Sequence, residues 1–179
     1  NHDEYIGADM DLSGFNDAAA AAVIWTRQQL TDEDRKWLSS LKYLRLVSNF
    51  TLVHATLDVP RKWGYVFNKL DAAASFTYQN TSVCFFGHTH VPVAFIRDSK
   101  VHGGTYSKFK IDQGKKYFIN VGSIGQPRDG DWRAAYVIYD MDEGTVELRR
   151  LEYDKETTKQ KIRAAGLPER LAERLDYGK

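Results

Sequence analysis

The chain has 179 residues, of which 42% are hydrophobic, and a formal net charge of +1. This length and apolar fraction predict one folded domain and exclude a disordered segment. No basic stripe is present, which argues against binding to a nucleic-acid duplex. No apolar run approaches the roughly 20 residues that cross a bilayer, and a lone cysteine cannot form an internal disulfide. We therefore expect a cytoplasmic protein without a membrane partner.

The first part of the chain is predicted to be helical. An alanine-rich run predicts a helix over residues 16–30, with Asn16 or Asp17 as its N-cap. Thr31, followed by three acidic residues, predicts the start of a second helix. The expected apolar face of this second helix consists of Trp37, Leu38 and Leu41.

Two strands and a helix are expected next. The strands cover residues 43–47 and 51–56 and are joined by a turn over 48–50, and the helix covers 67–78. Beyond it, turn signals separate apolar or alternating runs, which predicts β structure. The predicted strands cover residues 83–86, 91–97, 105–111, 116–121, 134–139 and 145–151. A final helix over 155–175 is interrupted at Gly166-Leu167-Pro168.

Two histidines follow one of these strands, in the segment Gly87-His88-Thr89-His90. Residues one apart on a strand point to opposite faces, so two ligands require that the chain turn away, which Gly87 permits. We expect both histidines in a loop beyond the strand's carboxyl end, where ligands bind in open α/β sheets. His54 ends another apolar run in the same way. The alternative interpretation is a pair of ordinary surface or core histidines.

Three segments in this order resemble the C-terminal motifs of the calcineurin-like metallophosphoesterase superfamily. They are Asn1-His2-Asp3, Val53-His54-Ala55 and Gly87-His88-Thr89-His90. The segment 120–131 and the tail around 165–168 resemble its small bacterial phosphodiesterase and diadenosine-tetraphosphatase-like branch. The resemblance covers essentially the whole chain and implies an α/β fold, a four-layer αββα sandwich.

The resemblance also implies a binuclear centre with two divalent metal ions, Mn, Fe or Zn, of which Mn is favoured. The implied ligands are Asn1, His54 and His88 for one ion and His90 for the other. A metal-bridging hydroxide would attack phosphorus, with His2 as acid or transition-state donor and Asp3 orienting it. The alternative for Asp3 is an ordinary acidic residue at a helix start.

A loop after His54 carries candidate substrate contacts. Arg61 and Trp63 would overhang the site, where a cation and an aromatic ring can hold a phosphate and an organic group. A loop packed by its own aromatic side chains is the alternative. Arg128 is a further candidate phosphate contact. The expected substrate is a small phosphodiester or a nucleotide phosphoanhydride.

Two motifs of the family are absent from the chain: an Asp-x-His after the first strand and a Gly-Asp pair after the second. They supply the remaining ligands, including the bridging aspartate. We therefore expect residues 1–179 to be the C-terminal portion of a longer domain. The omitted N-terminal portion, which contains the first βαβ units, would be on the order of 60–80 residues long. The alternatives are a non-catalytic scaffold with an incomplete metal centre and a Ser/Thr phosphoprotein phosphatase. The sequence predicts no oligomeric state.

Two further residues are expected to be structural. Cys84 lies within an apolar run, without a neighbour that would acidify its thiol, and is predicted to be a core residue. His102 precedes Gly103-Gly104 and is predicted to lie in a solvent-exposed turn.

Overall fold

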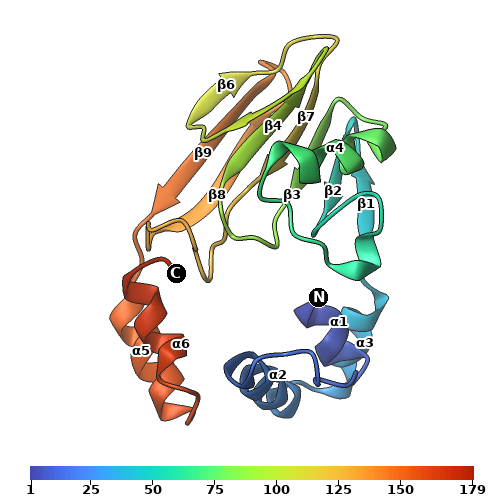
Figure 1. Cartoon of the computed structure of the whole chain (residues 1–179). Coiled ribbons are helices and arrows are strands. Elements are labelled where there is room, and N and C mark those ends of the chain that lie inside the picture. The colour runs from blue at the N-terminus through green and yellow to red at the C-terminus, as the bar shows by residue number, and fades with distance from the viewer. The chain divides into compact units, whose positions relative to one another are not determined.

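The structure is a computed structural model that describes residues 1–179. The chain forms two compact units, which we describe separately (Figure 1). Unit 1 consists of Asn1–Lys42 and Asp154–Asp176, and unit 2 of Tyr43–Tyr153 and Tyr177–Lys179. The expectation that residues 1–179 form a single domain stays a prediction.

Unit 1 is helical. Its helices are α1 (His2–Gly7), α2 (Asp17–Gln29), α3 (Asp32–Ser40), α5 (Lys155–Ala164), α6 (Arg170–Glu173) and the 3-10 turn η2 (Arg174–Asp176). The side chain of Asn16 caps α2 by accepting a hydrogen bond from the Ala19 N–H at 3.1 Å, so the first of the two predicted caps is confirmed. Thr31 and Asp34 form a reciprocal capping box at the start of α3.

The apolar face predicted for α3 was wrong. No residue of α3 is buried, and Trp37 is 63% exposed. Instead, α1 approaches α3 through a glycine, since a Cβ placed on Gly7 would lie 2.9 Å from the backbone nitrogen of Ser39. Contact between backbones leaves the larger apolar side chains of α3 outside the packed surface.

Unit 2 contains two β-sheets. The six-stranded sheet has the order β1 (Leu44–Val47), β2 (Phe50–Val53), β3 (Val83–Phe86), β7 (Lys116–Asn120), β4 (Val93–Arg97) and β5 (Val101–Gly104). The three-stranded sheet has the order β6 (Lys108–Lys110), β9 (Thr145–Leu151) and β8 (Ala134–Asp140). Strand β3 is parallel to both β2 and β7, and the other pairs are antiparallel. Together with the 3-10 turn η1 (Pro60–Lys62) and helix α4 (Lys69–Tyr78), these sheets confirm the predicted α/β class.

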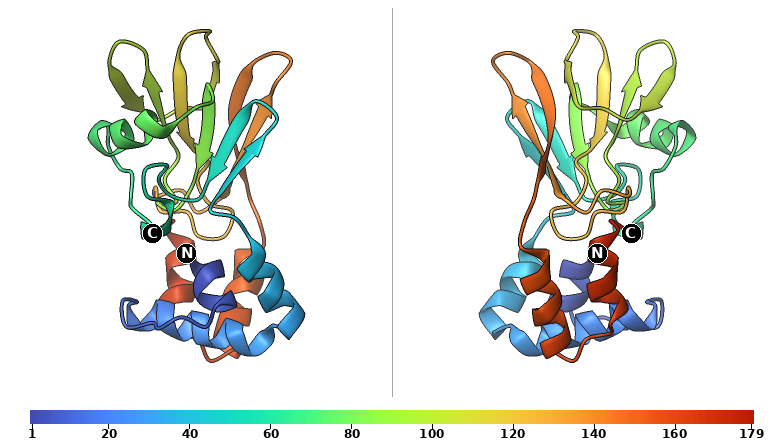
Figure 2. Two further views of the ribbon diagram at one scale, coloured as in Figure 1. Left: turned by 90° about the vertical axis from the view of Figure 1, so that its right-hand side faces the viewer. Right: turned by 90° about the vertical axis from the view of Figure 1, so that its left-hand side faces the viewer.

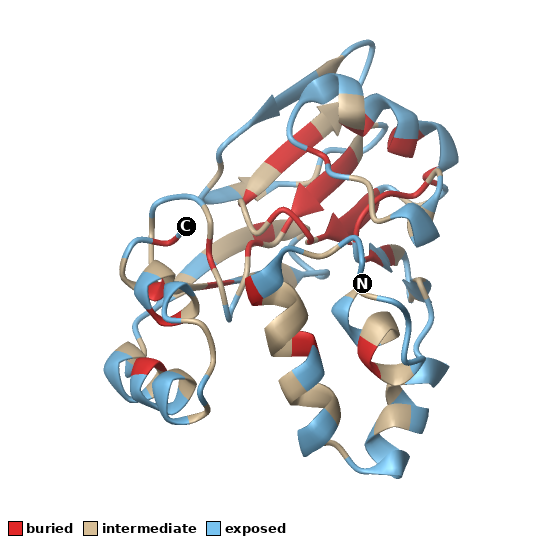
Figure 3. Ribbon diagram, turned by 60° about the horizontal axis from the view of Figure 1, so that its bottom comes forward, coloured by how far each residue is buried: buried red, intermediate tan, exposed pale blue.

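Side chains of the central strands alternate between two apolar layers, as the pleat of a strand requires. On one face, Cys84 and Phe118 pack with Phe76 of α4. On the other face, Phe85 and Ile119 pack against the three-stranded sheet, whose residues in this layer include Val146, Val137 and Tyr139. The result is a helix–sheet–sheet succession, which Figure 2 shows from two sides. The buried residues of unit 2 gather on these central strands (Figure 3).

Strand β5 was not predicted, and the turn predicted around His102 was wrong. His102 lies in the strand opposite Ile96, with its side chain exposed as expected and 3.5 Å from the Asp98 carboxylate. The adjacent Gly103 pairs with Phe95, and a Cβ on Gly103 would lie 2.6 Å from the Phe95 ring. Here glycine allows a cross-strand aromatic ring to cover the backbone rather than marking a turn.

The lone thiol lies in the core, as predicted. Cys84 is fully buried, and burial raises the pKa of its thiol. None of the helices combines the length and the apolar character that crossing a membrane would need.

Candidate metal centre

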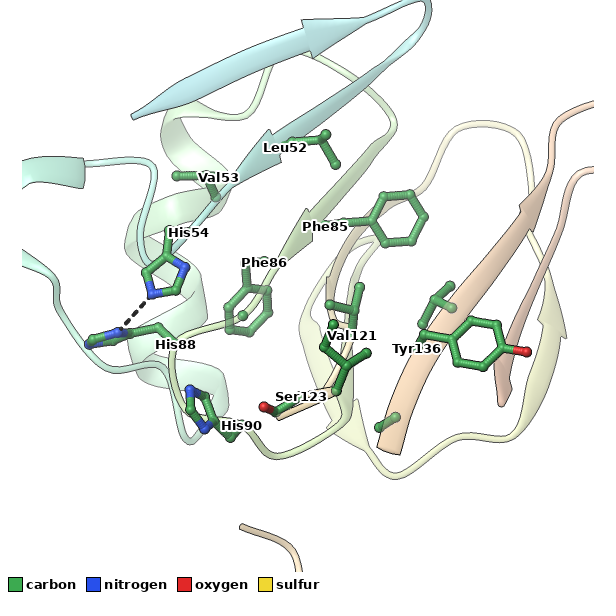
Figure 4. Close-up of a pocket in the computed structure, with 15 residues that line it drawn as sticks. Leu52, Val53, His54, Phe85, Phe86, His88, His90, Val121, Ser123 and Tyr136 are labelled. Atoms are coloured by element: carbon green, nitrogen blue, oxygen red, sulfur yellow. Dashed lines mark hydrogen bonds between the residues drawn. The ribbon is translucent and has the colours of Figure 1, made fainter. Parts of the chain in front are cut away.

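The parallel pairing of β2 and β3 brings two predicted ligands to one edge of the sheet. Leu52 is in register with Phe85, and two residues further the Gly87 N–H donates to the His54 carbonyl at 2.9 Å. As a result, Nδ1 of His88 lies 3.2 Å from Nε2 of His54 (Figure 4). Both histidines of the paired motif lie beyond the carboxyl end of β3, where the sequence placed them.

The backbone turns at the histidines themselves. His88 and His90 both have left-handed backbone conformations, with φ of 63° and 61°. This region costs a non-glycine residue about 1–2 kcal/mol, so surrounding contacts must hold it. Gly87, which was expected to permit the turn, is not in the left-handed region. The turn removes the strand alternation that would otherwise direct the two rings to opposite faces.

Asn120, the last residue of β7, holds this turn. Its fully buried side chain donates from Nδ2 to the Gly87 carbonyl at 2.6 Å and to Thr89 Oγ1 at 2.9 Å. Its Oδ1 accepts from the Gly122 N–H at 2.9 Å. Donors and acceptor are thus all engaged, which fixes the orientation of the amide. Sequence reasoning assigned Asn120 no role of its own, although a polar residue ending an apolar strand is the signal that marks it.

The loop after β7 orients His90. Nδ1 of His90 lies 2.7 Å from the Gln126 carbonyl oxygen. Because a carbonyl only accepts, Nδ1 carries the proton and Nε2 is the acceptor atom of the ring, as in metal-binding histidines. The Arg128 N–H donates to the His90 carbonyl at 3.1 Å, and Arg128 Nη2 donates to Gln126 Oε1 at 2.9 Å. The predicted phosphate contact Arg128 is therefore held next to His90.

The electrostatics of His88 favour its neutral form. Burial lowers its pKa to about 4, and the positive charge of Arg128 acts in the same direction. A hydrogen bond with the Trp63 backbone opposes this shift in pKa. The side chain is therefore a neutral imidazole at pH 7, which is the form that binds a metal ion.

The loop after His54 places its two predicted substrate contacts differently. Trp63, in a left-handed conformation with φ of 51°, lies edge-to-face with the His54 ring at 5.7 Å between centroids. Arg61 places its guanidinium 4.8 Å from the centre of the Tyr43 ring. The structure thus brings Trp63 to the histidines, whereas Arg61 stacks on Tyr43, the residue before β1.

The first three residues belong to unit 1, whereas His54, His88 and His90 belong to unit 2. Asn1 is the N-cap of α1, and Asp3 lies in the first turn of that helix. The His2 ring packs against the Phe15 ring at 5.5 Å between centroids. The roles implied for Asn1, His2 and Asp3 stay predictions.

The paired imidazoles fit a bound cation. Two nitrogens that bind one ion at about 2.0–2.1 Å lie about 2.9–3.4 Å apart for square or tetrahedral bond angles. The distance between His54 Nε2 and His88 Nδ1, 3.2 Å, falls within this range. No group of three or more His, Cys, Asp or Glu side chains in the structure is arranged to hold a metal ion. The described residues therefore offer two nitrogen ligands to one position, fewer than a full set.

A pocket of about 520 Å³ opens beside the histidines (Figure 4). His54, His88 and His90 line one part of it. The remaining wall is largely apolar and comes from the ends of strands in both sheets, including Leu52, Phe85, Val121, Ile124 and Tyr136. Its volume is that of a small-molecule site.

Comparison with known proteins shows the family of the chain. Residues 10–144 match the calcineurin-like phosphoesterase superfamily domain, a range that contains His54, His88, His90 and Arg128 but not residues 1–3. An uncharacterized protein of Methanocaldococcus jannaschii is 35% identical over an alignment of 187 residues, gaps included, that covers 100% of this chain and 74% of that protein.

Two solved structures are similar in fold. A metallophosphoesterase from Sphaerobacter thermophilus has a TM-score of 0.87 and 37% identity, covering 100% of this chain and 75% of that one. A hypothetical protein from Pyrococcus horikoshii OT3 has a TM-score of 0.76 and 17% identity, covering 99% of this chain and 71% of that one, and shows the fold alone. The chain therefore belongs to the calcineurin-like phosphoesterase superfamily.

Proposed function

We propose that this protein hydrolyses small phosphodiesters or nucleotide phosphoanhydrides with two divalent metal ions, preferably Mn²⁺. The family gives the reaction class, metal-dependent hydrolysis of phosphoesters. The observation that carries the proposal is the pair of imidazole nitrogens, 3.2 Å apart, that line a pocket of small-molecule size.

Each residue of the proposed site has a separate role in binding metal or phosphate. His54 and His88 bind one ion together with Asn1, and His90 binds the other through Nε2. When bound, divalent ions neutralise the charge that develops on the phosphoryl oxygens and supply a nucleophile from water at neutral pH. Arg128, held beside His90, binds a phosphate oxygen of the substrate through its guanidinium.

His2 and the loop after His54 complete the proposed site. His2 donates a proton to the leaving oxygen, and Asp3 orients and charges the imidazole of His2. Trp63 contacts the organic part of the substrate, and Arg61 contributes positive charge at the edge of the loop.

The test combines metal analysis with hydrolysis of bis(p-nitrophenyl) phosphate in the presence of Mn²⁺. His54→Ala and His88→Ala should each lose metal at one site, whereas His2→Ala should keep its metal and turn over more slowly. His102→Ala is the matched control, because this histidine is exposed on β5 and should change neither quantity. Metal content and turnover that survive His88→Ala unchanged would falsify the proposed site.

One observation favours a second candidate, a non-catalytic scaffold with an incomplete metal centre. No group of three or more potential metal ligands is arranged around a single position in the structure. Such a scaffold would show weak metal binding and no hydrolysis of phosphodiesters, diadenosine tetraphosphate or a phosphoserine peptide. Hydrolysis of the peptide alone would instead indicate a protein phosphatase.

A further inference from the structure

Two exposed aromatic rings extend from the buried His88. The Tyr65 ring stacks on the His88 ring with 4.4 Å between centroids and 24° between planes. The Phe67 ring stacks in turn on Tyr65, at 5.4 Å and 11°. Tyr65 is 52% exposed and Phe67 62% exposed. The structure therefore presents a continuous stack whose inner ring is a predicted metal ligand and whose outermost ring, Phe67, is open to a ligand.

The local chain explains why these rings stand side by side. Val66, between them, is 1% exposed and belongs to the core beneath α4. In an extended segment, residues two apart point to the same side, so burial of Val66 directs both neighbours outward. The Phe67 N–H donates to Asp71 Oδ2 at 2.9 Å, which joins the segment to the capped start of α4. The stack is held before any ligand arrives, which lowers the entropy cost of binding.

Phe67 also lines a second pocket, of about 390 Å³. One wall of this pocket contains Thr89 and Val91, from the segment that carries the histidines. Polar groups are available from Asn68, Lys69 and Thr105, and the backbone of Gly103 and Gly104 forms another part of the wall. A Cβ on Gly104 would meet no atom within 4 Å, so this stretch leaves open space for a flat ligand.

We propose that Tyr65 and Phe67 form a stacking subsite for a nucleobase, and that Phe67 makes the enzyme prefer nucleotides over phosphodiesters with aliphatic groups. This inference rests on the proposed function, because the phosphate is taken to bind at the histidines. Stacking on an aromatic side chain suits any base, since every base has a π-face. Lys69 and Thr105 supply charge and hydrogen bonds at the rim of the same pocket.

The kinetic test uses the full chain with Mn²⁺ and two substrates, diadenosine tetraphosphate and glycerophosphoethanolamine. Phe67→Ala should lower kcat/KM about tenfold for the adenine substrate and change it less than about twofold for the aliphatic one. Phe67→Tyr should restore the preference, because it restores an aromatic face. Tyr78→Ala is the matched control, since Tyr78 is 59% exposed on α4 and does not line the pocket. An equal loss for both substrates, or none for either, overturns the subsite.

A binding measurement separates failure of the subsite from failure of the proposed function. Calorimetry with adenosine monophosphate and with orthophosphate, both with Mn²⁺, requires no turnover. Phe67→Ala should weaken the nucleotide about tenfold and leave orthophosphate unchanged. A protein that hydrolyses neither substrate but shows this difference supports the subsite and contradicts only the reaction. Nucleotide affinity that does not depend on Phe67 overturns the subsite, whatever the protein hydrolyses.

Discussion

A single amide, that of Asn120, connects the loop of the two histidines to the end of β7. Its Nδ2 donates to the Gly87 carbonyl and to Thr89 Oγ1, and its Oδ1 accepts from Gly122. Because two histidines in left-handed conformations depend on these bonds, the amide supports the proposed metal site without being one of its ligands. It is a positioning residue of the kind that supports metal ligands from behind.

Asn120→Asp should weaken Mn²⁺ binding about 10- to 100-fold. The substitution keeps the shape of the side chain but replaces the donor with an acceptor that faces the Gly87 carbonyl. Titration followed by electron paramagnetic resonance measures the affinity. Asn49→Asp, at an exposed turn, is the control and should bind normally. Wild-type affinity in Asn120→Asp would show that the histidine loop holds its own shape.

Gly122 offers a second test at this scale. Its φ is +77°, and a Cβ there would lie 2.6 Å from Ala135 Cβ and 2.9 Å from Pro92 Cγ. Gly122→Ala should therefore cost about 2–4 kcal/mol of unfolding free energy, the sum of backbone strain and overpacking. Gly114→Ala, with φ of +82° and open space around it, isolates the backbone part of that cost. Urea denaturation measures both, and equal losses would rule out the steric part.

Local patterns predicted where the candidate ligands lie better than which residues support them. His54, His88 and His90 stand out because each follows an apolar run, and the structure joins two of them at 3.2 Å. Asn120 was not assigned a role, because its contacts arise only when segments about 30 residues apart meet. A pattern of neighbours along the chain contains no information about such pairs.

At the scale of elements, the loop between β7 and β8 connects the site to the three-stranded sheet. Its last part is held by Asp131, which accepts from Arg133 Nε at 3.0 Å and from Nη2 at 2.7 Å. Asp129, in the same loop, pairs with Arg150 of β9. The hydrogen bonds from Arg133, aided by the charge of Arg150, lower the pKa of Asp131 to about 2.

This shift in pKa predicts how the loop responds to acid. A carboxyl group with a lowered folded-state pKa stabilises the fold above its unfolded value, about 3.9, and loses that contribution as the pH falls toward 2. The difference in unfolding free energy between wild type and Asp131→Asn should therefore be largest above about pH 5 and shrink toward pH 2. Chemical denaturation at several pH values measures it. A difference that does not vary with pH would contradict the ion pair.

Elements with strong local signals were predicted well, and those shaped by packing were not. The N-cap at Asn16 and the capping box at Thr31 depend on residues within one turn, and both are confirmed. Phe50, predicted to lie in a turn, instead belongs to β2, where it meets the Phe85 and Tyr139 rings edge-on. Packing of rings from three distant segments decided that boundary, which local periodicity cannot reveal.

At the scale of the whole molecule, Cys84 offers a test of how metal binding couples to stability. This single thiol is fully buried in β3, the strand that leads into the histidines. It should react with Ellman's reagent only when the sheet opens, because burial both shields the sulfur and raises the pKa of the thiol. Rapid labelling of the native protein would contradict this packing.

Mn²⁺ should slow the labelling of Cys84 further. A ligand that binds only the folded state lowers the open population in proportion to its concentration above Kd. A thousandfold excess over Kd should slow labelling about a thousandfold, when opening and reclosing are fast relative to reaction. His88→Ala is the control, since loss of the metal ligand should remove the protection. Equal protection in this variant would place the stabilising ion elsewhere.

The position of β7 also governs when the histidine loop can form. In the sheet, β7 lies between β3 and β4, although it follows both along the chain. A nascent chain that has reached residue 119 therefore carries His54, His88 and His90 but not the side chain that bends their loop. Until β7 joins the sheet, Asn120 cannot hold His88 and His90 in their strained left-handed conformations. The histidine loop therefore takes its final shape only when β7 has joined the sheet, so the two candidate ligands and the central strand are completed together.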